Sequence, residues 1–284
     1  MTREPPIDVG QILVPVDGRE SALPALDHAV SLADESGASV HLLAVVDPYG
    51  LSSVTERTEV EADLEDAVAD AAARVQDAGV AVRTAVESGF PHEEILGYVD
   101  REGIDLVAMG THGRTGLDRY LLGSVAEKVV RLSPVPVLTV RPDAAGERPY
   151  RDVVVPTDGS DAAAPAERWG VGVAARSEAA VHALSVVPRE PIRSSETRAA
   201  YEDAAEAAIE RVRARADDVG VAFDGAVEHG VPHRGILDYA DRTGADLVVI
   251  GTHGRTGVER FVLGSVAEKV VRLSETPVLV VPSE

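Results

Sequence analysis

Two glycine-rich segments, each ending in a Gly-Ser step and an expected helix, contain the residues best suited to hold an anion. They are MGTHGRTGLDRYLLGSVAEKVV, from Met109 to Val130, and IGTHGRTGVERFVLGSVAEKVV, from Ile250 to Val271. Glycine has no β-carbon, so the backbone N–H groups of such a loop can approach a bound group closely. The free N–H groups and the dipole at the start of the helix also favour negative charge. The pattern therefore predicts contacts to phosphate.

A carboxylate that follows the first expected strand of each half is the second feature. Asp17 comes after ILVPV, and Asp158 comes after VVVPT. In an open α/β sheet, ligands bind outside the carboxyl ends of strands, where the strand order reverses. If the order is 3-2-1-4-5, the ends at Asp17 and Gly110 are neighbours at that point. The set fits a nucleotide, with phosphates on the glycine segments and ribose hydroxyls on Asp17.

Each of these residues also has a purely structural interpretation. Asp17 could be the N-cap of the following helix, and Ser124 could only cap its own helix, since Glu127 completes a capping-box pattern. His112 and His253 stand in the loops without a cysteine, an acidic pair or a second histidine beside them, so we expect no catalytic residue and no metal site. The sequence contains no GxxxxGK(S/T) loop, no GxGxxG after the first strand and no GxSxG elbow.

The elements that must position these residues occur twice, because the chain repeats itself at a fixed offset. Gly110 and Gly251 are 141 residues apart, and so are Asp17 and Asp158. Each copy is long enough to fold as a domain. The segment Pro142–Tyr150, rich in turn-forming residues, is the expected linker.

Within each copy, short apolar runs alternate with helical patterns, so a βαβαβαβαβ order and a doubly wound parallel sheet are expected. The runs DLVAM and DLVVI are continuously apolar, which suits parallel strands covered on both faces. A helix should begin at Pro91 and stop at Gly103. Pro15 and Pro156 should mark the carboxyl end of the first strand, since proline donates no N–H to a ladder. In the first copy the expected strands are residues 12–16, 40–46, 80–86, 105–110 and 136–140.

The composition is strongly acidic and argues against several classes of protein. The 284 residues include 48 acidic and 27 basic ones, giving a net charge of −21, and no cysteine. This balance argues against a nucleic-acid groove. No signal peptide and no membrane span are apparent, so a cytoplasmic protein is expected. Adaptation to a salt-rich cytoplasm explains the charge, and a GC-rich genome is the alternative explanation for the scarcity of lysine.

The repeated spacing Gly110-x2-Gly113-x9-Gly123-Ser124, present again as Gly251-x2-Gly254-x9-Gly264-Ser265, resembles the signature of the ATP-binding universal stress proteins. The resemblance extends to ILVPVDG and VVVPTDGS, to GFPHEEIL and GVPHRGIL, and to PVLTV and PVLVV, and it covers nearly all of both copies. It implies two tandem flavodoxin-like domains of the adenine nucleotide alpha hydrolase-like type, at residues 7–142 and 149–284. Each would be a five-stranded parallel sheet of order 3-2-1-4-5 with helices on both faces.

The resemblance also implies ATP in each domain, accompanied by Mg²⁺ or Mn²⁺. Asp17 and Asp158 would bind the ribose, and the glycines and serines would hold the phosphates. Val45 and Val186 would meet adenine through their backbone. The residues expected to line the two sites are Pro15, Val16, Asp17, Val45, Met109, Gly110, Gly113, Arg114, Gly123, Ser124, Val125, Pro156, Thr157, Asp158, Val186, Ile250, Gly251, Gly254, Arg255, Gly264, Ser265 and Val266.

One departure from the family pattern separates the two copies. The second has Asp158-Gly159-Ser160 after its first strand, as relatives commonly do, whereas the first has Asp17-Gly18-Arg19. The first copy is therefore expected to bind more weakly or to contact the nucleotide differently.

The resemblance implies a nucleotide-binding stress-response regulator or sensor. A nucleotide-independent interaction scaffold and a slow ATPase are the alternatives, the latter without an evident group to activate water. Arg114 and Arg255 could supply positive charge to the phosphates. The family also suggests pairing through the fifth strand, which the two copies could form within one chain, and a homo-oligomer is a further expectation. We expect no nucleic-acid or membrane partner.

Overall fold

The computed structural model describes residues 7–19, 22–50, 53–111, 122–144, 150–188, 195–254 and 263–283. These residues form two compact units, one of Asp8–Ala144 and one of Ala145–Glu284 together with Ile7. Tyr150, which we expected in the linker, is only 2% exposed. It groups with the second unit, although its side chain is not exposed as that of a linker residue usually is.

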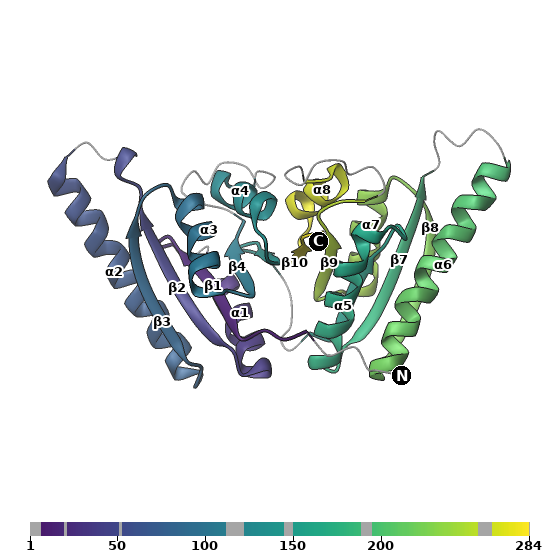
Figure 1. The fold of residues 1–284 in the computed structure, drawn as a ribbon, viewed down its shortest axis with the longest axis horizontal. Helices are drawn as coiled ribbons and strands as arrows, with labels where there is room; N and C mark the ends of the chain where they lie inside the picture. The colour runs from purple at the N-terminus through teal and green to yellow at the C-terminus, as the bar shows by residue number, and fades with distance from the viewer. Residues whose placement is uncertain are drawn as a thin grey trace. The chain divides into compact units, whose positions relative to one another are not determined.

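The first unit alternates strands and helices, as expected from its sequence (Figure 1). In chain order it contains β1 (Gln11–Val16), α1 (Leu23–Ser36), β2 (Ser39–Val46), α2 (Val54–Asp77), β3 (Val82–Ser88), α3 (Pro91–Glu102), β4 (Leu106–Gly110), α4 (Ser124–Leu132) and β5 (Val137–Val140). Its strand order is β3-β2-β1-β4-β5, and all neighbouring strands are parallel.

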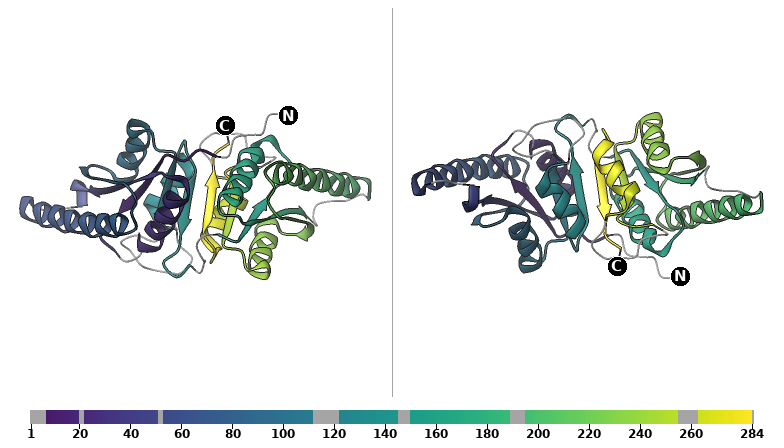
Figure 2. Two further views of the ribbon diagram at one scale, coloured as in Figure 1. Left: turned by 90° about the horizontal axis from the view of Figure 1, so that it is seen from below. Right: turned by 90° about the horizontal axis from the view of Figure 1, so that it is seen from above.

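The second unit repeats this architecture. It contains β6 (Asp152–Pro156), the short 3-10 helix η3 (Asp161–Ala163), α5 (Ala164–Arg176), β7 (Ala180–Pro188), α6 (Ser195–Val219), β8 (Phe223–Gly230), α7 (Pro232–Thr243), β9 (Leu247–Gly251), α8 (Ser265–Leu273) and β10 (Val278–Val281). The order β8-β7-β6-β9-β10 is again entirely parallel. Helices cover both faces of each sheet (Figure 2). The predicted doubly wound α/β fold is confirmed.

The local signals in the sequence set several element boundaries. Pro91 is the first residue of α3, where its missing N–H removes no helical hydrogen bond. The same helix ends at Gly103, which takes the left-handed conformation with φ of 65°. The β4 run Leu106–Met109 is fully buried, as expected for a strand covered on both faces.

The starts of the strands are held by one carboxylate in each unit. Asp105 Oδ2 accepts hydrogen bonds from the backbone N–H groups of Gly10 and Gln11, at 2.8 and 2.9 Å. Asp246 Oδ2 accepts equivalent bonds from Arg151 and Asp152, at 2.8 and 3.1 Å. These hydrogen bonds join the start of the first strand of each unit to the start of the fourth. They lie at the amino-terminal ends of the strands, opposite the expected site.

The carboxyl ends of those same strands separate from each other. Pairing between β6 and β9 covers only Val153–Val154 against Leu247–Val248, although β6 continues to Pro156 and β9 to Gly251. In the first unit, β1 and β4 likewise pair only as far as Leu13. Pro156 is the last residue of β6, so the proline marks the strand end as predicted. The strand order therefore reverses beside strand ends that are no longer hydrogen-bonded to each other.

Among the described residues, none of the helices combines the length and the apolar content that crossing a bilayer requires.

Candidate functional site

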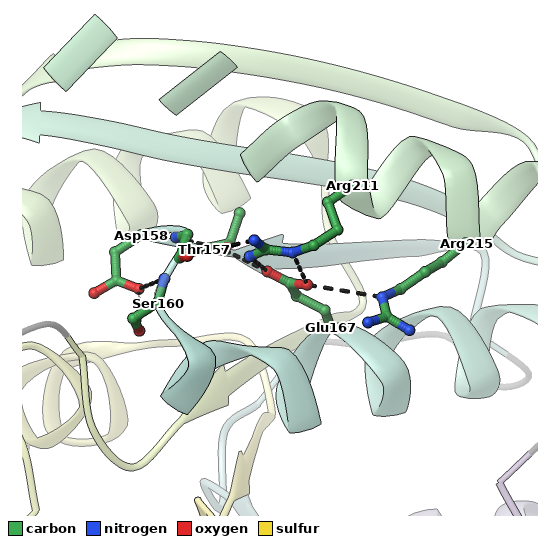
Figure 3. Close-up of polar contacts among 7 residues, drawn as sticks. Thr157, Asp158, Ser160, Glu167, Arg211 and Arg215 are labelled. Atoms are coloured by element: carbon green, nitrogen blue, oxygen red, sulfur yellow. Dashed lines mark hydrogen bonds and ion pairs between the residues drawn. The ribbon is translucent and has the colours of Figure 1, made fainter. Parts of the chain in front are cut away.

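The loop after β6 presents a carboxylate in a fixed orientation. Asp158 Oδ1 accepts hydrogen bonds from the backbone N–H of Ser160 at 3.0 Å and from its hydroxyl at 2.6 Å (Figure 3). Gly159 between them takes a φ of 80°, a conformation that favours glycine. The Asp-Gly-Ser sequence thus forms a self-bonded turn that holds the Asp158 carboxylate at the end of the strand.

Three glycines of the repeated motif lie in close contact with neighbouring segments, and one of them, Gly254, contacts this turn. A β-carbon built on Gly254 would stand 2.6 Å from Asp158 Oδ2, and one on Gly251 would stand 3.2 Å from the carbonyl oxygen of Ala162. A β-carbon on Gly264 would stand 3.0 Å from the carbonyl oxygen of Thr252. A side chain at Gly254 would therefore displace the Asp158 carboxylate, and side chains at Gly251 and Gly264 would be tightly crowded by backbone carbonyl groups.

The starts of α4 and α8 correct one structural interpretation of the motif. Gly123 and Gly264 are the N-caps, and no side chain of the described chain caps either helix. Ser124 and Ser265 are the first helical residues and are exposed. The capping-box interpretation is wrong because the serine lies one position too late. The first turn of each helix therefore keeps backbone N–H groups without a side-chain cap, which are the donors that anion sites at helix N-termini use.

The first unit shows the same arrangement in part. Asp17 Oδ1 accepts a hydrogen bond from the Arg19 N–H at 3.2 Å, and the N-cap of α1 is Ala22, so Asp17 does not cap that helix. The Gly123 N–H donates to the Thr111 carbonyl oxygen at 2.7 Å, which brings the start of α4 to the end of β4. The expected site residues Gly113, Arg114 and Arg255, and His112, lie outside the described residues.

The remaining residues expected at the site lie at or near the carboxyl ends of the strands in each unit. Met109 and Ile250 are 5% and 6% exposed, at the ends of β4 and β9. Val45 and Val186 lie just beyond the last residues of β2 and β7 that pair with the first strand of their unit. The others lie at the carboxyl ends of the first strands, at the end of β4 or in the first turns of α4 and α8, namely Pro15, Val16, Pro156, Thr157, Gly110, Val125 and Val266.

A buried ion pair lies beneath the Asp158 turn, and the sequence analysis did not anticipate it. Glu167 on α5 is fully buried. Arg211 on α6 meets it with two hydrogen bonds, from Nη2 to Oε1 at 2.6 Å and from Nε to Oε2 at 3.0 Å (Figure 3). Thr157 Oγ1 donates to Glu167 Oε1 at 2.6 Å, and Arg215 Nε lies 3.8 Å from Oε2. The carboxylate therefore joins the end of β6 to two helices.

Arg211 also contacts the turn itself. Its Nη1 donates to the carbonyl oxygen of Gly159 at 3.3 Å, while the Gly159 N–H donates to Thr157 Oγ1 at 3.1 Å. The hydrogen bonds to Glu167 raise the pKa of the Arg211 guanidinium above its ordinary value, against the opposing effect of burial. A comparison of the two copies could have revealed this cluster. At the repeat offset, Glu167 and Arg211 of the second copy align with Leu26 and Asp70 of the first, so the second copy alone has this pair of opposite charges.

Of the two motif histidines, His253 lies in the described part of the chain, and its ring contacts hydroxyl groups. His253 Nδ1 lies 3.0 Å from Thr252 Oγ1 and 3.3 Å from the Ser283 hydroxyl. Burial and the neighbouring lysines lower the pKa of His92 and His233, which are the second residues of α3 and α7. The described part of the chain contains no group of three histidine or carboxylate side chains that could hold a metal ion.

The family model of the universal stress protein family matches residues 9–141 and again residues 149–282. The chain belongs to this family. It is a tandem member with two universal stress protein domains, as the repeated motif predicted.

Two relatives from Methanocaldococcus jannaschii each match about half of this tandem universal stress protein. Universal stress protein MJ0531 is 36% identical over 143 residues, which cover 48% of the chain and 84% of the relative. Universal stress protein MJ0577 is 32% identical over 152 residues, which cover 46% and 94%. Each relative therefore corresponds in size to one domain of this chain.

A solved structure covers both domains at once. The universal stress protein from Archaeoglobus fulgidus DSM 4304 has a TM-score of 0.76 and 24% identity, and the match covers 96% of each chain. At this identity the likeness concerns the fold alone.

Proposed function

We propose that this tandem universal stress protein binds an adenine nucleotide in each domain. The observation that carries the proposal is the approach of Gly254 to the Asp158 carboxylate at the carboxyl ends of β6 and β9. There the strand order reverses and the two strands are no longer paired. This is the position at which doubly wound α/β folds bind ligands. The motif of the first domain has the same spacing.

In the second site, different protein groups contact the ribose, the phosphates and the adenine of the nucleotide. The Asp158 carboxylate accepts hydrogen bonds from the ribose hydroxyls, as an acidic residue near a strand end does in other nucleotide folds. The backbone of Gly251 and Gly254 and the first turn of α8, with the Ser265 hydroxyl, donate to the phosphates. The backbone of Val186 lies at the edge of β7 and meets the adenine ring.

The glycines support this assignment of the phosphates, because the absence of a β-carbon leaves room beside the backbone. A β-carbon at Gly251, Gly254 or Gly264 would occupy the narrow gaps between the two loops and the helix start. A polyphosphate that follows the backbone needs those gaps free of side chains. Mg²⁺ or Mn²⁺ would enter with the phosphates, because such ions usually bind to nucleotide sites through the phosphate oxygens and a small number of carboxylates.

The proposed role is that of a stress-response regulator or sensor, whose occupancy by nucleotide is the signal. Pairing of the two domains through their fifth strands, and a cytoplasmic location, belong to the same proposal.

Nucleotide content and binding test the proposal. Mass spectrometry of the supernatant after denaturing the purified protein should detect ATP or ADP. Calorimetric titration of nucleotide-free protein with ATP and Mg²⁺, in high-salt buffer, should give about two sites per chain. The absence of binding at millimolar ATP would instead support a nucleotide-independent scaffold.

A further inference from the structure

The second domain contains a buried ion pair at a place where the first domain has apolar and exposed residues. The three residues that meet in it are Thr157, Glu167 and Arg211. At the repeat offset their counterparts are Val16, Leu26 and Asp70. Leu26 is 2% exposed, so the same position is in the core of both domains but carries a charge in only one.

The turns after the first strands are therefore supported in different ways. In the first domain, α2 meets the Gly18 turn through hydrocarbon, since a β-carbon there would stand 3.7 Å from Ala67 Cβ and 3.8 Å from Leu64 Cδ2. In the second domain, α6 reaches the Gly159 turn with the hydrogen bond from Arg211 Nη1. A hydrogen bond restricts both distance and angle, whereas hydrocarbon contact is non-directional.

Glu167 holds Arg211 in place for this contact. A fully buried carboxylate must remain paired, and the paired N–H groups of a guanidinium fix its orientation as well as its distance. The Thr157 hydroxyl binds the same carboxylate, and Asp158 is the next residue. Side chains of α5 and α6 therefore hold the Asp158 turn in position without a ligand.

We propose that Arg211 is a positioning residue for the second nucleotide site. Together with Glu167 it fixes residues 157–160 in the binding conformation before the nucleotide arrives. This inference rests on the proposed function and adds a second, physical reason for the two sites to be unequal, beside the Asp17-Gly18-Arg19 departure in the first copy. A loop that is already ordered loses less free energy on binding, so the second domain binds adenine nucleotide more tightly than the first.

The decisive variant removes both charges of the pair together. Glu167→Leu/Arg211→Met leaves the net charge unchanged and introduces the leucine that the first copy has at this position. Folds commonly tolerate the replacement of a buried ion pair by apolar side chains of similar size. Arg211→Lys is the conservative variant, because lysine keeps the charge but lacks the planar fork. Arg213→Met, on the same helix, is the matched control.

Trp169 gives a readout specific to the second domain. It is the sole tryptophan of the chain and lies on α5, two residues after Glu167. ATP titrations followed by its fluorescence should show about tenfold weaker binding in the double variant, the loss expected when a loop is competent about one tenth of the time. Arg211→Lys should recover part of the affinity, and Arg213→Met should match the parent.

Hydrogen exchange of the backbone at residues 157–163, measured without nucleotide, reports the order of the turn directly. We expect faster exchange in the double variant at an unchanged thermal unfolding temperature. A double variant that binds ATP as the parent does, or that exchanges at the parental rate, overturns the inference. A parent protein that binds no nucleotide overturns the proposed function instead, and the exchange rates still decide whether Arg211 orders the turn.

Discussion

Gly254 lies so close to Asp158 that a β-carbon at position 254 would stand 2.6 Å from the Asp158 Oδ2 atom. The aspartate cannot easily move away, because its other oxygen is held by the N–H and the hydroxyl of Ser160. One added methyl group at position 254 therefore disturbs both halves of the proposed site.

We expect Gly254→Ala to weaken ATP binding in the second domain by at least about tenfold, a loss of about 1.4 kcal/mol. The methyl group displaces the ribose-binding carboxylate and fills the gap left for phosphate. Calorimetry, with Trp169 fluorescence to identify the domain, measures the effect. Gly230→Ala is the matched control, since a β-carbon there meets no atom within 4 Å. Equal affinities of the two variants would place the nucleotide elsewhere.

Arg211→Met should destabilise the second domain by about 3 kcal/mol, because it leaves the fully buried Glu167 without its bidentate partner. The value lies at the low end of the usual range, since the Arg211 side chain is 37% exposed and Arg215 remains near. Urea unfolding followed by Trp169 fluorescence measures the change.

The control for that experiment is Arg213→Met on the same helix, whose pair with Glu210 is about half exposed. It should cost about 1 kcal/mol or less. If both arginine variants lose the same free energy, the buried pair has no special role in the stability of the domain.

The stability of the first domain should fall as the pH drops below about 6.5. His41 is fully buried, and burial, with a smaller contribution from Arg83, lowers its pKa in the folded state. The unfolded state therefore binds a proton that the folded state excludes. This stabilising contribution is complete above the unfolded pKa of about 6.5 and is lost as the pH falls below it, by up to about 1.4 kcal/mol per pH unit.

Replacing His41 with asparagine should reduce this dependence on pH. The difference in unfolding free energy between pH 7 and pH 5, obtained from urea titrations followed by circular dichroism, should be smaller in the variant than in the parent. His41 Nδ1 lies 3.1 Å from Tyr98 Oη, so the variant also loses a contact, and only the change with pH is diagnostic. An identical change in both proteins would refute a role for His41.

The melting temperature should rise with salt. A net charge of −21 repels itself over a Debye length of about 30 Å at 0.01 M salt, which shortens to about 3 Å at 1 M. A gain of about 1–2 kcal/mol corresponds to a rise of roughly 2–8 °C for a domain of this size. Differential scanning calorimetry at the two salt concentrations provides the test. A flat profile favours the genomic explanation of the composition.

ATP hydrolysis should be slower than about one turnover per second, below the range of most dedicated enzymes. His253 Nδ1 contacts the hydroxyls of Thr252 and Ser283, which do not orient a histidine as a general base in the way that a carboxylate partner does. Phosphate release by purified protein with Mg²⁺ measures the rate, and the Gly113→Ala/Gly254→Ala double variant controls for contaminating enzymes. Faster turnover that disappears in this variant would make His253 the first candidate for a base.

The sequence was sufficient to predict the fold because its signals are local and repeated. Pro91 and Gly103 act within one helix, and the fixed offset reveals two domains without reference to contacts. The convergence of Asp158 and Gly254 also follows from topology, since residues at neighbouring strand ends must lie close. The nucleotide that they would bind stays a prediction.

The ion pair was beyond sequence reasoning because it depends on packing between helices. Glu167 and Arg211 are 44 residues apart on different helices, and each resembles a solvated charge when considered alone. The role of Ser124 depended on a shift of one residue at the start of α4, which the capping-box pattern cannot resolve. Such errors arise where a few ångströms of geometry, and not composition or periodicity, determine the outcome.

The buried Glu167 also constrains the order in which the two copies could diverge. A glutamate in the core without Arg211 would leave an uncompensated charge, whereas an arginine on α6 opposite a leucine could turn its head to water. If the duplicated ancestor carried leucine, the arginine had to arise first. If it carried the ion pair, the glutamate had to be lost first. In either direction, the tolerable intermediate has the arginine without the glutamate. Tandem relatives that preserve this intermediate stage should contain that combination.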